Sequence, residues 1–285
     1  MTRRFTTLAW SAAAFTYLLI VLGAVVRITG SGLGCGDHWP LCNGHFFPPL
    51  DDIGTVIEWS HRLVAALVSI LVIALAVYDW WLRPPGRRAA RPSHIAVSLL
   101  VLQVLLGAVT VKLELPPWSV VLHLGTAMLL LATLLVAASP PAPRFVLQPR
   151  TIVLLSLAFV TVLFGALTAN LGAAAACGGF PLCNGQVWVT AGPLALIQWT
   201  HRLLAYAFAI AATVWAMRSP ACGPKIVLGL IVLQICVGAA TVLLGLPRGL
   251  QAAHVAVGAA VWAGVVLAAT AAKTTGPGIA SGAPT

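Results

Sequence analysis

Long apolar segments dominate this chain and limit the folds that it can adopt. Of its 285 residues, 60% are hydrophobic and only 8% are charged, and the mean hydropathy is +0.99. Segments of roughly 18 or more apolar residues with few charges are typical of membrane-spanning helices. Eight such segments occur, at about 8–28, 55–78, 94–112, 118–138, 151–170, 195–217, 225–245 and 251–271. The sequence therefore predicts an all-α integral membrane protein with eight transmembrane helices.

The basic residues indicate the orientation of the chain in the membrane. A net charge of +10 could suggest a nucleic-acid partner, but the charge is unevenly distributed. Lys and Arg gather in the N-terminal segment, in the connections that follow the second, fourth and sixth spans, and in the tail. In contrast, residues 29–57 and 171–197 contain none. By the positive-inside rule, this bias places both termini in the cytoplasm. We expect a multi-pass protein of the cell (inner or plasma) membrane. We expect the lipid bilayer, and no nucleic acid, as a partner.

The chain contains an internal repeat. The segment 57–63 (IEWSHRL) recurs at 197–203 (IQWTHRL), and 102–111 (LQVLLGAVTV) recurs at 233–242 (LQICVGAATV). Each half carries an even number of predicted helices, so the repeats are parallel, whereas inverted repeats need an odd number. We therefore expect two four-helix bundles, at 1–142 and 143–272, related by a pseudo-twofold axis along the membrane normal. The remaining residues, 273–285, are predicted to be a disordered tail.

Four histidines fall at matched positions of the repeat. His61 and His201 lie about two turns into their helices, and His123 and His254 lie within the first two turns of theirs. In the predicted topology, all four lie near the outer leaflet, and each half contributes a pair from alternate helices. Two facing imidazoles are a usual way to hold a six-coordinate b-type haem in a helical bundle. The alternative is that each histidine bonds a backbone or hydroxyl group and packs helices together.

One acidic residue distinguishes the two halves. Glu58 precedes His61 by three residues on the same helical face, and Gln198 takes its place in the second half. An amide cannot take up a proton at ordinary pH, so only the first half has this acid–base capacity. Glu58 is therefore a candidate proton acceptor or donor. The alternative is a glutamate near a helix N-terminus that is favoured by the helix dipole.

Other polar residues in and near the membrane have more than one interpretation. Arg62 and Arg202 follow the histidines directly and could pair with haem propionates, or could snorkel or pack between helices. Gln103 and Gln234 occupy matched mid-membrane positions and are predicted to hydrogen-bond between helices. The cysteine pairs Cys35–Cys42 and Cys177–Cys183 lie in outer loops, where disulfides are the simpler interpretation and a redox role for the first pair is the alternative.

These residues together resemble the haem A synthase family, membrane enzymes that make haem A for terminal oxidases. The resemblance covers about residues 8–271. It is carried by Glu58-x-x-His61-Arg62, the Cys35…Cys42 loop and the four histidines. The resemblance implies two four-helix bundles and an oxidoreductase that converts the C8 methyl group of haem O to a formyl group by successive hydroxylations.

The resemblance also implies roles for individual residues. His61 and His123 would be ligands of the substrate haem, and His201 and His254 would hold a haem B cofactor. Glu58 would be the catalytic carboxylate that removes protons or stabilises a cationic intermediate. Haem O is then the substrate and haem A the product. An unidentified electron acceptor, haem O synthase and oxidase assembly factors would be partners.

Two other functions are compatible with the sequence. A non-catalytic di-haem cytochrome b that carries electrons would use all four histidines, but it gives no reason for the difference between Glu58 and Gln198. A transporter of haem or another small molecule is compatible with parallel repeats, but it would need a polar path through the membrane. The sequence leaves open the electron acceptor, the source of the oxygen atom and the oligomeric state.

Overall fold

The computed structural model describes residues 2–49, 51–81, 92–139, 149–190 and 192–271. It contains eight long α-helices and one short 3₁₀ helix, and within the described ranges there is no β-strand. Their bounds are α1 Arg3–Thr29, α2 Ile53–Trp81, α3 Pro92–Lys112, α4 Pro117–Ala138, α5 Pro149–Asn170, η1 Ala173–Ala175, α6 Pro193–Arg218, α7 Cys222–Leu243 and α8 Arg248–Ala271. All eight α-helices are long and apolar enough to cross a membrane. The prediction of an all-α, multi-pass membrane protein is confirmed, and the predicted tail at 273–285 lies outside the described residues.

Local capping signals set the ends of the helices. The Thr2 side chain accepts a hydrogen bond from the backbone N–H of Phe5, so α1 begins five residues before the predicted span. The Asp52 carboxylate accepts one from the backbone N–H of Thr55 at 2.6 Å and caps α2. Four helices have proline as their first residue, where the missing N–H costs nothing: α3, α4, α5 and α6. Hydropathy therefore locates each span, whereas capping residues locate its ends.

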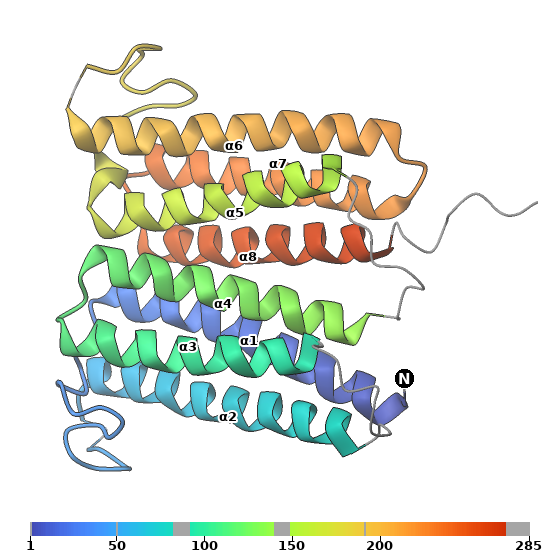
Figure 1. Ribbon diagram of the computed structural model, residues 1–285. Coiled ribbons are helices and arrows are strands. Elements are labelled where there is room, and N and C mark those ends of the chain that lie inside the picture. Colours follow the sequence, from blue (N-terminus) through green and yellow to red (C-terminus); the bar gives the residue numbers. More distant parts are fainter. Residues whose placement is uncertain (1, 50, 82–91, 140–148, 191, 272–285) are drawn as a thin grey trace, which may run out of the picture.

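The helices pack into two groups that follow the chain order (Figure 1). In the N-terminal half, α1 contacts α2 and α4, and α3 contacts α2 and α4. In the C-terminal half, α5 contacts α6 and α8, and α7 contacts α6 and α8. Helices α1, α4, α5 and α8 form the contacts between the halves. The same pairings thus recur in each half, while the pseudo-twofold relation between the halves stays a prediction.

Helix α4 lies at the centre of the molecule. It contacts α1, α3, α5 and α8, and its buried residues include Met128, Leu131 and Leu134. The indole N–H of Trp262 on α8 donates to the carbonyl of Met128 at 2.8 Å, and the Tyr17 hydroxyl on α1 donates to the carbonyl of Ala256 on α8 at 3.0 Å. Hydrogen bonds of this kind satisfy buried polar groups inside a membrane bundle, where water is absent. The two halves are therefore joined by a packed apolar seam with specific polar links.

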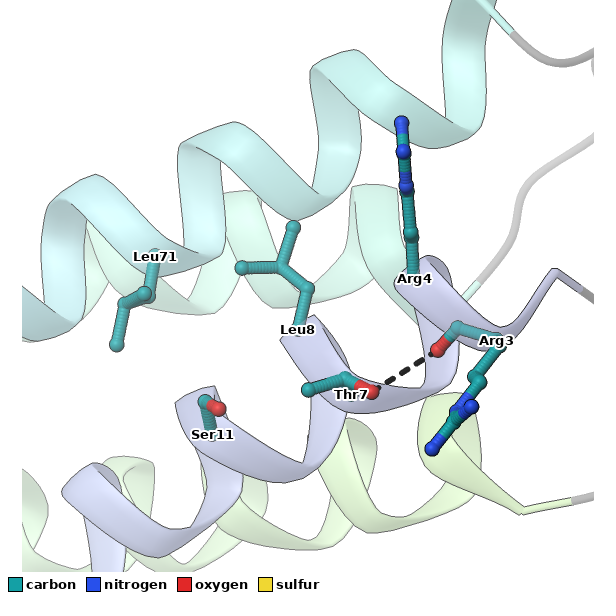
Figure 2. Close-up of a pocket in the computed structure, with 6 residues that line it drawn as sticks. All are labelled: Arg3, Arg4, Thr7, Leu8, Ser11 and Leu71. Atoms are coloured by element: carbon teal, nitrogen blue, oxygen red, sulfur yellow. Dashed lines mark hydrogen bonds between the residues drawn. The ribbon is translucent and has the colours of Figure 1, made fainter.

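The two ends of the molecule differ. The long connections that carry the cysteine pairs lie at one end, and the N-terminus lies at the other (Figure 1). A shallow hollow of about 520 Å³ opens between α1 and α2 near the N-terminus (Figure 2). Its lining consists of Arg3, Arg4, Thr7, Leu8, Ser11 and Leu71. The even-numbered helices α2, α4, α6 and α8 all begin at the end that carries the cysteine connections, so their first turns face away from this hollow.

Candidate functional site

The four histidines occupy equivalent places in their helices. His61 and His201 are each eight residues past the first residue of α2 and α6. His123 and His254 are each six residues past the first residue of α4 and α8. At 1.5 Å per residue, these offsets correspond to depths of about 12 Å and about 9 Å from the helix starts. The even-numbered helices therefore carry all four imidazoles at comparable depths near one end of the bundle.

Each histidine ring lies against a glycine of the preceding helix. A methyl group on Gly23 of α1 would lie 3.2 Å from Cε1 of His61, and one on Gly107 of α3 would lie 3.2 Å from Cε1 of His123. In the second half, the matching distance is 2.9 Å, both for Gly165 of α5 with His201 and for Gly238 of α7 with His254. Real Cβ atoms rarely approach so closely. The glycines therefore make the room in which the four rings lie.

The rings of each half lie near one another. His61 and His123 are within direct Coulomb range of each other, and so are His201 and His254. Each of the four histidine side chains is partly exposed in the structure. The structure thus brings together the two histidine pairs that the sequence predicts, one pair in each half.

Several polar atoms around these rings are buried without a partner. They are Nδ1 of His61, His123 and His254, and the side-chain carbonyl oxygens of Gln103 and Gln234. The amide nitrogens of the two glutamines lie 3.1 Å from Nε2 of His123 and 3.4 Å from Nε2 of His254, which confirms the predicted hydrogen bonds between helices. In contrast, Nδ1 of His201 lies 3.1 Å from the carbonyl of Thr161 on α5. Unpaired buried polar atoms are uncommon in folded proteins, and they cluster here around imidazoles.

The residues present fit a haem in each half. Imidazole is a usual axial ligand of haem iron, and a pair of imidazoles on facing helices is a common arrangement for such a group in a bundle. Such a group would bind where the four glycines border the rings (the glycine cradles), at the partly exposed rings and near the unpaired polar atoms. The ligands available are His61 with His123 in one half, and His201 with His254 in the other.

Glu58 is buried and holds the first outer loop onto α2. One carboxylate oxygen accepts a hydrogen bond from the backbone N–H of Cys35 at 2.8 Å. The other oxygen is paired with the guanidinium group of Arg62, whose Nε lies 3.1 Å away. Arg62 also donates to the carbonyls of His38 and Leu41 in the same loop. The hydrogen bonds of Glu58 therefore connect it to the loop and to Arg62, which is one turn further along the helix.

The second half repeats this arrangement with an amide. The side-chain oxygen of Gln198 accepts a hydrogen bond from the backbone N–H of Cys177, again at 2.8 Å. Arg202 donates to the carbonyls of Gly179, Leu182 and Cys177 at 3.0, 2.8 and 2.9 Å. Both arginines, left open as propionate partners or packing residues, thus bind loop carbonyls in this structure. This contact with the loop was not predicted from the sequence, although Glu58 and Gln198, two side chains of equal length with an acceptor oxygen, stand at matching positions of the repeat.

Both predicted disulfides are present in the structure. Cys35 is bonded to Cys42, and Cys177 is bonded to Cys183. All four half-cystines are buried, and each bond closes a short loop that lies beside the start of α2 or α6. Cys222, the first residue of α7, and Cys236 are free thiols. Each disulfide loop therefore lies against the first turns of the helix that carries His61 or His201.

Known proteins resemble this chain along most of its length. Residues 6–266 match the COX15-CtaA family, described as cytochrome oxidase assembly protein. A Bacillus licheniformis protein named Heme A synthase is 34% identical over 258 residues, which are 83% of this chain and 85% of that protein. Proteins of the same name are 33% identical in Geobacillus kaustophilus, over 87% of this chain and 86% of the relative, and 33% identical in Bacillus pumilus, over 72% of each chain.

Proposed function

This chain belongs to the COX15-CtaA family of cytochrome oxidase assembly proteins, and we propose that it is a haem A synthase, an enzyme that converts haem O to haem A. The observation that carries this proposal is the duplicated histidine pair with an ionisable carboxylate in only one of the two halves. The relatives named Heme A synthase, matched over more than four fifths of the chain, support it. The protein then acts in the biosynthesis of haem A for cytochrome oxidase.

The proposed reaction oxidises the C8 methyl group of haem O to a formyl group by successive hydroxylations. Loss of water from the doubly hydroxylated carbon completes the conversion. With water as the oxygen source, the balance is R–CH₃ + H₂O → R–CHO + 4 H⁺ + 4 e⁻. The site must therefore release both protons and electrons, and the two halves divide these tasks.

The substrate haem is assigned to the N-terminal half, between His61 and His123. Gly23 and Gly107 border the imidazoles of His61 and His123. The two imidazoles would hold the haem iron, and through it they would set the position of the methyl group. Precise placement of this kind contributes to catalysis because the reacting atom no longer has to be brought into position. Glu58, on the helix of His61, is the group assigned to accept protons that the methyl group loses.

The cofactor haem B is assigned to the C-terminal half, between His201 and His254. A haem bound there would supply an iron that changes its oxidation state and passes electrons from the substrate to an acceptor. The protein's own contribution is to hold the two imidazoles. The carbonyl of Thr161 binds Nδ1 of His201, which leaves Nε2 as the nitrogen with a free electron pair.

The loop at the outer end completes the site. The chain is assigned to the cell membrane with both termini in the cytoplasm, so the disulfide loops face the oxidising side, where disulfides persist. Arg62 pairs with Glu58 and binds two loop carbonyls, and it therefore holds the carboxylate and the loop in one arrangement. A positioning role of Arg62 follows from these contacts.

Chemical analysis of the bound haems tests the proposed function. The protein is purified in detergent from cells that also make haem O, and its haems are extracted and identified by mass. We expect haem B together with haem O, a hydroxylated haem O or haem A. Haem B alone, even with haem O supplied, would contradict the proposal and indicate an electron-carrying cytochrome. Absence of any haem would contradict both functions.

A further inference from the structure

The two histidines of each half differ in what their Nε2 atoms contact. Nε2 of His123 lies 3.1 Å from the amide nitrogen of Gln103, and Nε2 of His254 lies 3.4 Å from that of Gln234. Within the part of the chain that the structure describes, Nε2 of His61 and of His201 accepts no hydrogen bond. Each half therefore has one imidazole whose Nε2 is engaged by a glutamine and one whose Nε2 is not.

The glutamine and the glycine that contact one ring come from the same helical face. Gln103 and Gly107 are four residues apart on α3, and so are Gln234 and Gly238 on α7, a spacing that stacks them on one side of a helix. The glycine borders Cε1 of the ring and the glutamine borders Nε2. Helices α3 and α7 thus hold their histidines at two adjacent ring atoms, so the contact fixes the direction of the ring.

The electron pair on Nε2 can serve only one partner at a time. A neutral imidazole has one N–H and one nitrogen with a free electron pair. An amide nitrogen can only donate, so its hydrogen bond uses the free pair of Nε2 and places the ring proton on Nδ1. Haem iron would bind through the same electron pair. The glutamine amide and an iron atom therefore compete for Nε2 of His123 and of His254.

The unpaired atoms around these contacts indicate that another group belongs there. Nδ1 of His123 and of His254 and the carbonyl oxygens of both glutamines are buried without a hydrogen-bond partner. A glutamine that served only to pack two helices would have its oxygen paired, because an unpaired buried acceptor destabilises the fold. The same incomplete arrangement occurs in both halves, at equivalent positions.

We propose that Gln103 and Gln234 are positioning residues that make His123 and His254 releasable ligands, while His61 and His201 are the permanent ligands. When His123 leaves the iron, the Gln103 amide receives its Nε2 and stabilises the released ring. Gln234 does the same for His254. In the N-terminal half, this exchange opens one axial position of the substrate haem while His61 keeps the haem in place. The inference rests on the proposed function, because it requires a haem in each half.

Carbon monoxide binding to the reduced, haem-loaded protein measures the release of a histidine directly. Carbon monoxide binds a six-coordinate ferrous haem only after an axial ligand leaves, so its binding rate reports how often the ligand is released. We expect two kinetic phases, one for each half. Gln103→Leu should slow one phase and Gln234→Leu the other, each by about threefold to tenfold, the factor contributed by one hydrogen bond of ordinary net strength.

Matched variants separate a positioning role from a structural one. Gln103→Asn keeps an amide but draws it back from the ring, so it should slow the same phase as Gln103→Leu. His123→Ala should retain a five-coordinate haem that binds carbon monoxide without a slow step, whereas His61→Ala should lose the haem of the N-terminal half. Thermal unfolding identifies variants that fold as the parent protein does.

The outcomes distinguish this inference from the function on which it rests. Unchanged phases in folded Gln103→Leu and Gln234→Leu proteins would overturn the inference and leave the proposed function standing. Loss of the haem from His123→Ala but not from His61→Ala would also overturn it, because the permanent ligand would then be the other one. A parent protein without any haem would overturn both the proposed function and the inference.

Discussion

The starts of α2 and α6 form two nearly identical sites that differ in one ionisable group. In the first, Glu58 receives the backbone N–H of Cys35; in the second, Gln198 receives that of Cys177, and both distances are 2.8 Å. Arg202 holds its loop through three carbonyls without a carboxylate partner within the described residues. An amide oxygen is therefore sufficient to anchor the loop, and the arginine does not need a carboxylate to bind it. The second site anchors its loop without a charge at this position. The charge of Glu58 is therefore not needed to hold the loop, which favours a chemical role.

The histidine pairs of the two halves also differ in their hydrogen bonds. Both halves place an imidazole against a glycine twice, and both engage one imidazole with a glutamine. His201 additionally binds the carbonyl of Thr161, whereas Nδ1 of His61 is buried without a partner. The second half thus holds its histidines more completely than the first. That difference suits a permanently bound cofactor in the second half and an exchangeable substrate in the first.

Replacing Glu58 should have the largest effect on activity. Glu58→Gln keeps the hydrogen bond to Cys35 but removes the proton acceptor, so formation of the formyl group should fall by roughly 10²–10⁴-fold. Haem binding should remain, and Glu58→Ala should behave in the same way. The measurement is the amount of haem A by mass analysis of extracted haems. Gln198→Ala is the matched control, and normal haem A output from both Glu58 variants would contradict the assignment.

Removing the arginines should affect stability unequally. Arg62→Gln leaves the buried Glu58 carboxylate without its counter-ion, and removing one partner of a buried pair costs about 3 kcal/mol. Arg202→Gln removes three hydrogen bonds but leaves no unpaired charge, so it should cost less. Thermal unfolding in detergent compares the two variants. Equal losses would mean that the carbonyl contacts, which the two arginines share, dominate.

Adding a methyl group to the glycines that border the histidines should destabilise the second half more than the first. Gly238→Ala places a methyl group 2.9 Å from His254, whereas Gly107→Ala places one 3.2 Å from His123. Overpacking typically costs about 1–3 kcal/mol, so we expect a lower unfolding temperature and a changed low-spin haem signal in electron paramagnetic resonance, with the larger change for Gly238→Ala. Gly229→Ala, on the same helix as Gly238, meets no atom within 4 Å and serves as the control. Identical effects of Gly238→Ala and Gly229→Ala would contradict the cradle.

Acid should loosen the start of α2 and not that of α6. The backbone and side-chain hydrogen bonds from Thr55 hold the pKa of Asp52 below its usual value. Folding therefore favours the ionised carboxylate: its stabilising effect is present at neutral pH and is lost as the pH falls through the lowered pKa. Helix α6 begins after Gly192 without a side-chain cap and has no such dependence. Proteolysis of the two loops against pH measures the small difference, which Asp52→Asn should remove.

The sequence by itself determined the features that depend on local pattern. Eight apolar segments predicted the eight helices, because a segment must be apolar over its whole length to cross the bilayer. The repeated motif located the histidines and Glu58, and matched cysteine spacings predicted both disulfides. Helix ends were less accurate, since capping by Thr2 and Asp52 does not depend on hydropathy.

Only the tertiary structure decided which atoms meet. The contacts of Gly23 with His61 and of Gly165 with His201 depend on how neighbouring helices approach each other. Likewise, the loop that folds back onto Glu58 becomes visible only in three dimensions. In a membrane, the hydrophobic pattern does not determine how a helix is rotated about its axis, because lipid is as apolar as the side chains. Rotation and register of the helices, which set these contacts, are fixed by close packing and by buried hydrogen bonds.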